Sequence, residues 1–172
     1  QVLGTFGKFG VLSFNGNKMI TTSGGGALVC QSAEDKNTVM WYATQARDAY
    51  PYYQHTAIGY NYRMSNVVAS VVRGQFPYLN EHIAHKKAIY EGYKDGLKVL
   101  PVSMNQMDLE NSEQNYWLSC LIIDKKTMCK QVHSEQDVCY VKEPGKSCPT
   151  EILEAISSIN AEGRPIWKPM HM

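Results

Sequence analysis

The stretch GTFGKFGVLSFNGNKMITTSGGGALV, residues 4–29, decides the fold, because short apolar and β-branched runs alternate in it with glycine and asparagine. Runs of this kind, bounded by turn residues, are typical of short β-strands. The pattern predicts three of them, at residues 11–14, 19–22 and 27–30.

Lys18 follows the first predicted strand and an Asn-Gly turn, in a neighbourhood rich in hydroxyl side chains and glycine. Glycine amides and hydroxyl groups bind phosphate, and a lysine amine that is desolvated loses its proton and becomes a nucleophile toward a carbonyl carbon. From spacing alone, an exposed turn lysine without a chemical role is the simpler interpretation. The glycines of residues 4–10 lack the spacing of a nucleotide-binding loop and precede a strand, so they indicate a turn.

Two helical regions follow this segment. Ser32 is a suitable N-cap for a helix within residues 32–49, and Pro51 then begins an aromatic, polar loop that runs to about Tyr62. A second helix is expected from Met64. Its first part is apolar on several sides, and a helix of this kind is normally buried.

Pro77 must kink or break the second helix, because proline lacks the amide hydrogen and crowds the preceding turn. The continuation is amphipathic and should end near Gly96, with His82 on its solvated face. The most natural boundary between two units lies at this kink. The sequence therefore predicts one domain in residues 1–77, and the connecting helix with a second domain in residues 78–172.

The second part of the chain has an α+β pattern. Residues 115–123 are expected to form a well-buried strand, whereas residues 125–148 are polar and give no clear assignment. Pro149 begins a helix with one apolar face, and Gly163 should stop it.

The charge of the chain is balanced, with 17 Lys and Arg against 16 Asp and Glu and a net charge of +1. That balance excludes a strong electrostatic attraction to nucleic acid or to an anionic membrane. No apolar run approaches the roughly 20 residues of a membrane span, and no signal peptide is evident. Both ends are expected to be cut, since the chain starts without methionine and stops without a closing helix or polar tail.

The cysteines form an odd, scattered set without a CxxC pair: Cys30, Cys120, Cys129, Cys139 and Cys148. This pattern favours reduced thiols in the cytoplasm over a disulfide framework. The set Cys129, His133, Cys139 and Cys148 can be considered as zinc ligands, but its spacing fits no common zinc pattern, so no metal is expected.

Three blocks in this order resemble the DegT/DnrJ/EryC1/StrS family of PLP-dependent nucleotide-sugar aminotransferases. The first is residues 4–29, quoted above. The second, GYNYRMSN at residues 59–66, resembles the family's G-x-N-x-R-x-S/T segment, and the third, GRPIWKPMH at residues 163–171, resembles its R-P-x-W-x-P-x-H segment. Three ordered motifs are far more specific than one, and they favour a chemical role for Lys18 over the turn-lysine interpretation.

The resemblance implies a role for several residues. Lys18 matches the lysine that carries pyridoxal 5'-phosphate (PLP) as a Schiff base and later moves a proton between substrate and cofactor. Ser13 matches the serine that bonds the cofactor phosphate. Asn61 matches the asparagine that reaches the phosphate of the neighbouring subunit's cofactor, which implies a homodimer with a shared active site. Arg63, Lys168 and His171 match positions near the substrate, although a structural role is open for each of them.

The implied fold is α/β, the aspartate-aminotransferase-like fold of PLP-dependent transferases, present here as part of the large domain and part of an α+β C-terminal domain. The implied reaction moves an amino group from glutamate to a keto sugar on a nucleotide carrier, for amino-sugar, glycan or surface polysaccharide biosynthesis. The alternative is a non-catalytic fragment or relative that acts in binding or regulation. A dehydratase of the same family is a further option, but that branch replaces the Schiff-base lysine, whereas Lys18 is present. The family's aspartate partner of the pyridine nitrogen is expected shortly before Gly4 and is not in the sequence.

Overall fold

The computed structural model describes residues 2–133 and 138–167. Their contacts divide the chain into two compact units, Gln1–Ala84 and His85–Met172, and the division falls inside one helix. The domains predicted from the sequence, with a boundary after Pro77, concern the complete protein and stay a prediction.

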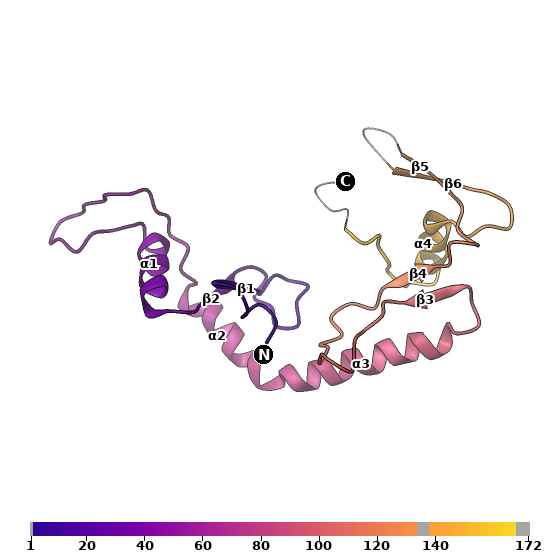
Figure 1. The fold of residues 1–172 in the computed structure, drawn as a ribbon, viewed down its shortest axis with the longest axis horizontal. Helices are drawn as coiled ribbons and strands as arrows, with labels where there is room; N and C mark the ends of the chain where they lie inside the picture. The colour runs from indigo at the N-terminus through magenta and orange to yellow at the C-terminus, as the bar shows by residue number, and fades with distance from the viewer. Residues whose placement is uncertain (1, 134–137, 168–172) are drawn as a thin grey trace. The chain divides into compact units, whose positions relative to one another are not determined.

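The first unit begins with an antiparallel hairpin of β1 (Phe9–Ser13) and β2 (Gly26–Cys30) (Figure 1). Both strands were expected from their β-branched residues and bounding glycines. The strand predicted at residues 19–22 is wrong, because residues 19 and 20 form bends and residues 21 and 22 have no regular structure. The peptide groups of Thr21 bond to the side chain of Gln75 and not to a neighbouring strand.

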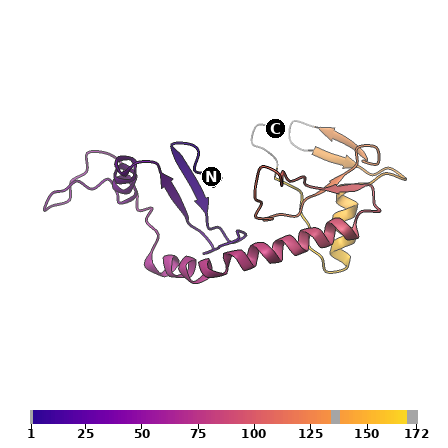
Figure 2. The same ribbon diagram turned by 60° about the horizontal axis from the view of Figure 1, so that its bottom comes forward.

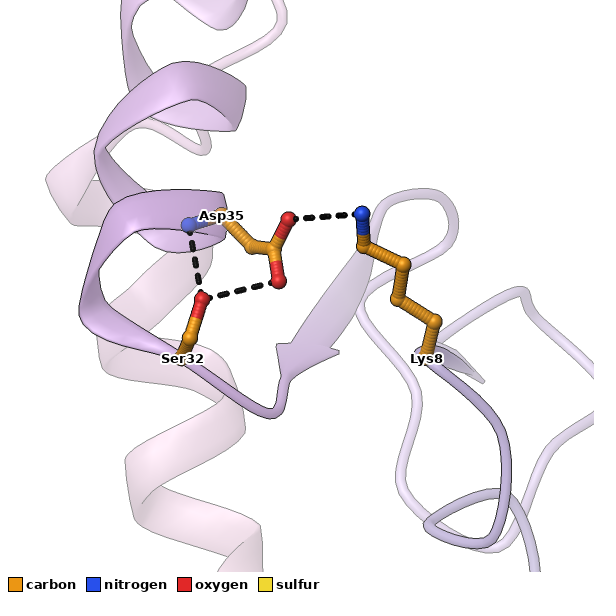
Figure 3. Close-up of polar contacts among 3 residues, drawn as sticks. All are labelled: Lys8, Ser32 and Asp35. Carbon is orange, nitrogen blue, oxygen red and sulfur yellow. Dashed lines mark hydrogen bonds and ion pairs between the residues drawn. The ribbon is translucent and has the colours of Figure 1, made fainter.

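Helix α1 (Ala33–Ala43) follows β2 and is capped as the sequence predicts. The hydroxyl of Ser32 accepts the backbone N–H of Asp35 at 3.0 Å and donates to its carboxylate at 2.8 Å. Lys8 Nζ lies 3.2 Å from the same carboxylate, so the cap also ties α1 to the start of the hairpin (Figure 3). The Ser32 hydroxyl, and then Lys8, hold the pKa of Asp35 below its ordinary value of 3.8.

Two consecutive helices follow the loop after α1. Helix α2 (Asn66–Gln75) leads through a 3-10 turn at Phe76–Tyr78 into α3 (Leu79–Gly96), and Figure 2 shows this succession. Pro77 interrupts the α-helical pattern as predicted. The expectation that α2 is buried is wrong for this chain. None of the residues of α2 is buried, and the side chain of Val67 is 76% exposed. The other described residues pack against only part of the valine-rich surface of this helix.

After α3, the described part of the second unit contains two small antiparallel strand pairs and a helix (Figure 1). Their bounds are β3 (Val102–Met104) with β4 (Leu121–Ile123), β5 (Lys130–His133) with β6 (Val138–Val141), and α4 (Pro149–Ser158). The hairpin of β5 and β6 supplies structure to a region that the sequence left unassigned.

The strand predicted at residues 115–123 is mostly wrong, since only β4 pairs with a neighbour. Tyr116 has a left-handed φ of 54°, which a strand does not allow. The N–H of Cys120 bonds to the side chain of Asn105 at 2.9 Å and not to a strand partner. Helix α4 begins at Pro149 as predicted but ends before Gly163, because Asn160 has a left-handed φ of 60°.

Few apolar side chains are buried in the described parts of the chain: Ile20, Ala46, Tyr90, Tyr116, Cys129 and Cys148. In the second unit the rings of Tyr90 and Tyr116 pack with centroids 5.6 Å apart. The hydroxyl of Tyr90 donates to the carbonyl oxygen of Asn105 at 2.7 Å. Within residues 2–133 and 138–167, no helix has the length and apolar character that crossing a membrane requires.

Candidate functional site

Ser13 is the last residue of β1, and Lys18 lies in the connection that follows it to β2. Ser13 ends β1 opposite Gly26, and the N–H of Lys18 donates to the carbonyl of Asn15 at 3.0 Å in a tight turn. The backbone of Phe14 closes this connection from both sides, because its N–H bonds to Gly25 at 3.0 Å and its carbonyl accepts the N–H of Thr22 at 2.9 Å. The loop that carries Lys18 is therefore held at its base as a closed unit.

Gln75 attaches this loop to the end of α2. Its Oε1 accepts the N–H of Thr21 at 3.1 Å, and its Nε2 donates to the carbonyl of the same residue. On α3, Nδ1–H of His82 donates to the carbonyl of Met19 at 3.2 Å, so the expectation of a solvated His82 is wrong. Neither contact has a local signal in the sequence, since the paired residues are more than fifty positions apart.

Asn61 lies on a segment that runs back along the end of α1. It forms an antiparallel bridge with Thr44, and its neighbours Tyr60 and Tyr62 donate their N–H groups to carbonyls of Tyr42 and Ala43 at 3.1 and 3.0 Å. These backbone bonds fix the main chain, while the side chain of Asn61 is exposed. Arg63, two residues on, is exposed as well.

Gly59 allows this close approach. A Cβ at Gly59 would lie 2.5 Å from the backbone nitrogen of Ala46 and 2.7 Å from the carbonyl carbon of Gln45. Gln45 and Ala46 have left-handed φ values of 69° and 49°, and they end α1 well before residue 49, where the sequence predicted its end. The first position of the motif at residues 59–66 therefore has a packing reason to be glycine.

Lys168 and His171 lie outside the described residues. The part of their motif that the structure describes contains Trp167, whose ring stacks on Trp117 with centroids 5.7 Å apart, and Arg164, whose guanidinium lies 4.9 Å from the centre of the Trp167 ring. Among the residues that the structure describes, no group of three or more His, Cys, Asp or Glu side chains is arranged to hold a metal ion.

The sequence model of the DegT/DnrJ/EryC1/StrS aminotransferase family matches residues 1–142, which include both the Lys18 loop and the Asn61 segment. The chain belongs to this family. A curated relative named as a pyridoxal phosphate-dependent aminotransferase, EpsN from Bacillus subtilis (strain 168), is 37% identical over 168 residues, which are 98% of this chain and 38% of EpsN. GDP-perosamine synthase from Vibrio cholerae is 28% identical over 98% of this chain and 41% of its own length.

The fold agrees with membership of the DegT/DnrJ/EryC1/StrS family. The crystal structure of the aminotransferase TlmJ from Streptoalloteichus hindustanus superposes with a TM-score of 0.80 at 18% identity, over 100% of this chain and 42% of TlmJ. The predicted fold class, that of the PLP-dependent aminotransferases, is thereby confirmed. The chain spans about two fifths of the length of the curated relatives it matches.

Proposed function

We propose that the complete protein is a PLP-dependent sugar aminotransferase, which moves an amino group from glutamate to a keto sugar on a nucleotide carrier. Family membership supports the reaction, and the GDP-perosamine synthases among the relatives support a nucleotide-linked sugar as the acceptor. The amino sugar made in this way would serve glycan or surface polysaccharide biosynthesis. The free thiols of the chain support a cytoplasmic location, where such thiols stay reduced.

The observation that carries the proposal is that a closed loop holds the amine of Lys18 and that the strand residue directly before this loop, Ser13, carries a hydroxyl. The Ser13 oxygen accepts the N–H of Asn15 at 3.4 Å, which leaves the hydroxyl hydrogen available for a phosphate oxygen. A Cβ at Gly16 or Gly24 would meet nothing within 4 Å, so a phosphate could approach their amides. These residues fit the phosphate and the reactive carbonyl of PLP.

Lys18 would have two tasks in the reaction. PLP, when bound, supplies a carbonyl carbon for covalent attachment and an electron-withdrawing ring. Lys18 Nζ would first hold the cofactor through that carbonyl, and once the amino substrate has displaced it, the same nitrogen would carry the proton between the substrate carbon and the cofactor. The bonds from Gln75 and His82 to Thr21 and Met19 would keep the loop in place during this exchange.

The resemblance places the carboxylate partner of the PLP ring nitrogen shortly before Gly4, and residues 1–3 contain no acidic side chain, so another part of the complete protein would supply it. The alternative function, a non-catalytic binding or regulatory module, is not favoured. The chain retains Lys18 together with Ser13, and its relatives are named for enzymes.

Asn61 would act in the active site of a second subunit. Its main chain is fixed by bonds to the end of α1 while its side chain is exposed, which suits an amide that must reach a phosphate on a neighbouring molecule. The proposal therefore includes a homodimer with shared sites. Arg63, Lys168 and His171 are proposed as substrate contacts.

The test uses the full-length protein with Lys18→Arg, which keeps the charge and removes the reactive amine. We expect the wild-type protein to show the visible absorbance of lysine-bound PLP, and borohydride reduction to leave the cofactor on the peptide that contains Lys18. The variant should show neither signal and should not transfer an amino group from glutamate.

Lys8→Ala is the matched control, because Lys8 precedes the same hairpin but pairs with Asp35. This variant should keep both signals. PLP found on Lys8 or on another lysine after reduction would overturn the assignment of Lys18.

A further inference from the structure

Cys129 and Cys148 form a pair of buried thiols in the second unit, apart from the loop that carries Lys18. Cys129 is 4% exposed and Cys148 is 1% exposed, and each thiol contributes to the shift in the pKa of the other. Eighteen residues, 130–147, separate the two in the sequence, and their spacing did not predict that these two thiols pair.

The backbone brings the two cysteines side by side. Met128 and Ser147 form a parallel bridge, and the N–H of Cys129 donates to the carbonyl of Ser147 at 3.0 Å. The N–H of Ser147 in turn donates to the carbonyl of Thr127 at 2.7 Å. Since each cysteine directly follows a bridged residue, their main chains are about 5 Å apart, as in neighbouring strands. This separation lies within the Cα distances that a disulfide accepts, about 4.4–6.8 Å.

The two thiols have different environments. Cys148 directly precedes α4, and the backbone N–H of Glu151 in the first turn of that helix is the main influence that lowers the pKa of its thiol, against the opposing effect of burial. Burial is the main influence that raises the pKa of the Cys129 thiol, and contact with Cys148 and the charge of Glu143 add to it. Cys148 is thus the thiol that ionises first, while Cys129 keeps its proton.

We propose that Cys129 and Cys148 are a redox-sensitive pair that hydrogen peroxide converts to a disulfide and that thiols reduce again. In the first step the Cys148 sulfur attacks one peroxide oxygen; an S–O bond forms, the O–O bond breaks, and the departing hydroxide takes up a proton. In the second step the Cys129 sulfur attacks the Cys148 sulfur; the S–S bond forms, and hydroxide leaves with the Cys129 proton as water. Two thiols lose two electrons, and one peroxide becomes two waters.

The disulfide would join the start of β5 to the start of α4. Because it closes the loop of residues 130–147, it restricts the unfolded chain and should stabilise this unit. Peroxide is close to water in size and can reach a buried sulfur more easily than a larger oxidant. We therefore expect peroxide to oxidise the pair faster than oxidised glutathione does.

The experiment treats the reduced full-length protein with one equivalent of hydrogen peroxide, alkylates the remaining thiols and maps the peptides by mass spectrometry. We expect a Cys129–Cys148 linked peptide, loss of two of the five alkylatable thiols that residues 1–172 contain, and a rise in Tm of roughly 5 °C that dithiothreitol reverses. A link between any other pair, or no linked peptide, would overturn the proposal.

Two variants separate the roles of the thiols. In Cys129→Ser, peroxide should leave Cys148 as a sulfenic acid that dimedone traps when the protein is unfolded, because the second sulfur is missing. Cys139→Ser is the matched control, since Cys139 is exposed on β6 and should not affect the link. If dimedone trapped a sulfenic acid on Cys139 and not on Cys148 in Cys129→Ser, the order of the two steps would be contradicted. The peptide map of the wild-type protein tests the disulfide itself, even if a variant fails to fold.

Discussion

At the scale of single residues, Gly59 tests how tightly the Asn61 segment packs on the end of α1. In Gly59→Ala the new methyl group would lie 2.5 Å from the backbone nitrogen of Ala46, a residue with no exposed surface. Backbone must move to admit it, and we expect the free energy of unfolding to fall by about 1–3 kcal/mol. The amides of Gln45 and Tyr60, which bond across this contact, should exchange their hydrogens faster.

Gly92→Ala is the matched control for this substitution. Gly92 lies within α3, and a Cβ there would meet nothing within 4 Å. Alanine should stabilise the helix by about 0.5–1 kcal/mol. If urea unfolding showed that both substitutions change the free energy of unfolding in the same direction, the close approach at Gly59 would not be the cause of the destabilisation.

Gln75 is a second residue whose substitution should affect the proposed active site, because it bonds to the loop that carries Lys18. In Gln75→Leu both peptide groups of the half-buried Thr21 lose their side-chain partner, which should lower the free energy of unfolding by about 1–2 kcal/mol. Because the same loop carries Lys18, PLP should also bind the full-length variant more weakly in a titration followed by absorbance. Arg73→Leu, an exposed position on the same helix, should leave the affinity for PLP unchanged.

At the scale of secondary-structure elements, the cap of α1 makes a prediction that depends on pH. Ser32→Ala removes the bond to the N–H of Asp35 and should lower the free energy of unfolding by about 1 kcal/mol near neutral pH. Since the folded state lowers the pKa of Asp35, its stabilising contribution is present above the ordinary value of 3.8 and is lost as pH falls through the lower folded value.

The pKa of Asp35 can be followed directly by an NMR titration of its carboxyl group. Ser32→Ala should move it toward 3.8, because the Ser32 hydroxyl is the largest cause of the shift. Lys8→Ala removes both the hydrogen bond and the charge of the lysine, and it should also raise the pKa of Asp35 toward 3.8 while the helix cap remains. An unchanged pKa of Asp35 in either variant would contradict the role given to that residue.

Elements whose signals are local could be predicted from the sequence, whereas those that depend on distant side chains could not. Ser32 and Pro149 start their helices, and Pro77 interrupts one, through the geometry of their own and adjacent residues. The strands expected at residues 19–22 and 115–123 failed because distant side chains, those of Gln75 and Asn105, occupy the backbone groups that a strand would pair. In the proposed site, the motifs around Lys18 and Asn61 are local and could be identified in the sequence. The bonds from Gln75 and His82 that hold the Lys18 loop join distant residues and could not be predicted.

At the scale of the whole molecule, the two parts of the proposed site lie on separate segments of the first unit. Lys18 is in the connection between β1 and β2, and the backbone of Asn61 is bonded along the end of α1. If the two residues act on the same cofactor, they come either from one chain or from two. The homodimer proposed above requires that they come from two, and mixed dimers distinguish these cases.

Lys18→Arg and Asn61→Asp variants of the full-length protein should each be inactive, the second because its carboxylate repels the cofactor phosphate. After the two are unfolded together and refolded, half of the dimers should be mixed, and each mixed dimer should hold one site with both native residues. Amino transfer should return to about one quarter of the wild-type rate, as the statistics of a twofold dimer require. Sites made within one chain would recover no activity, since every chain carries one of the two changes.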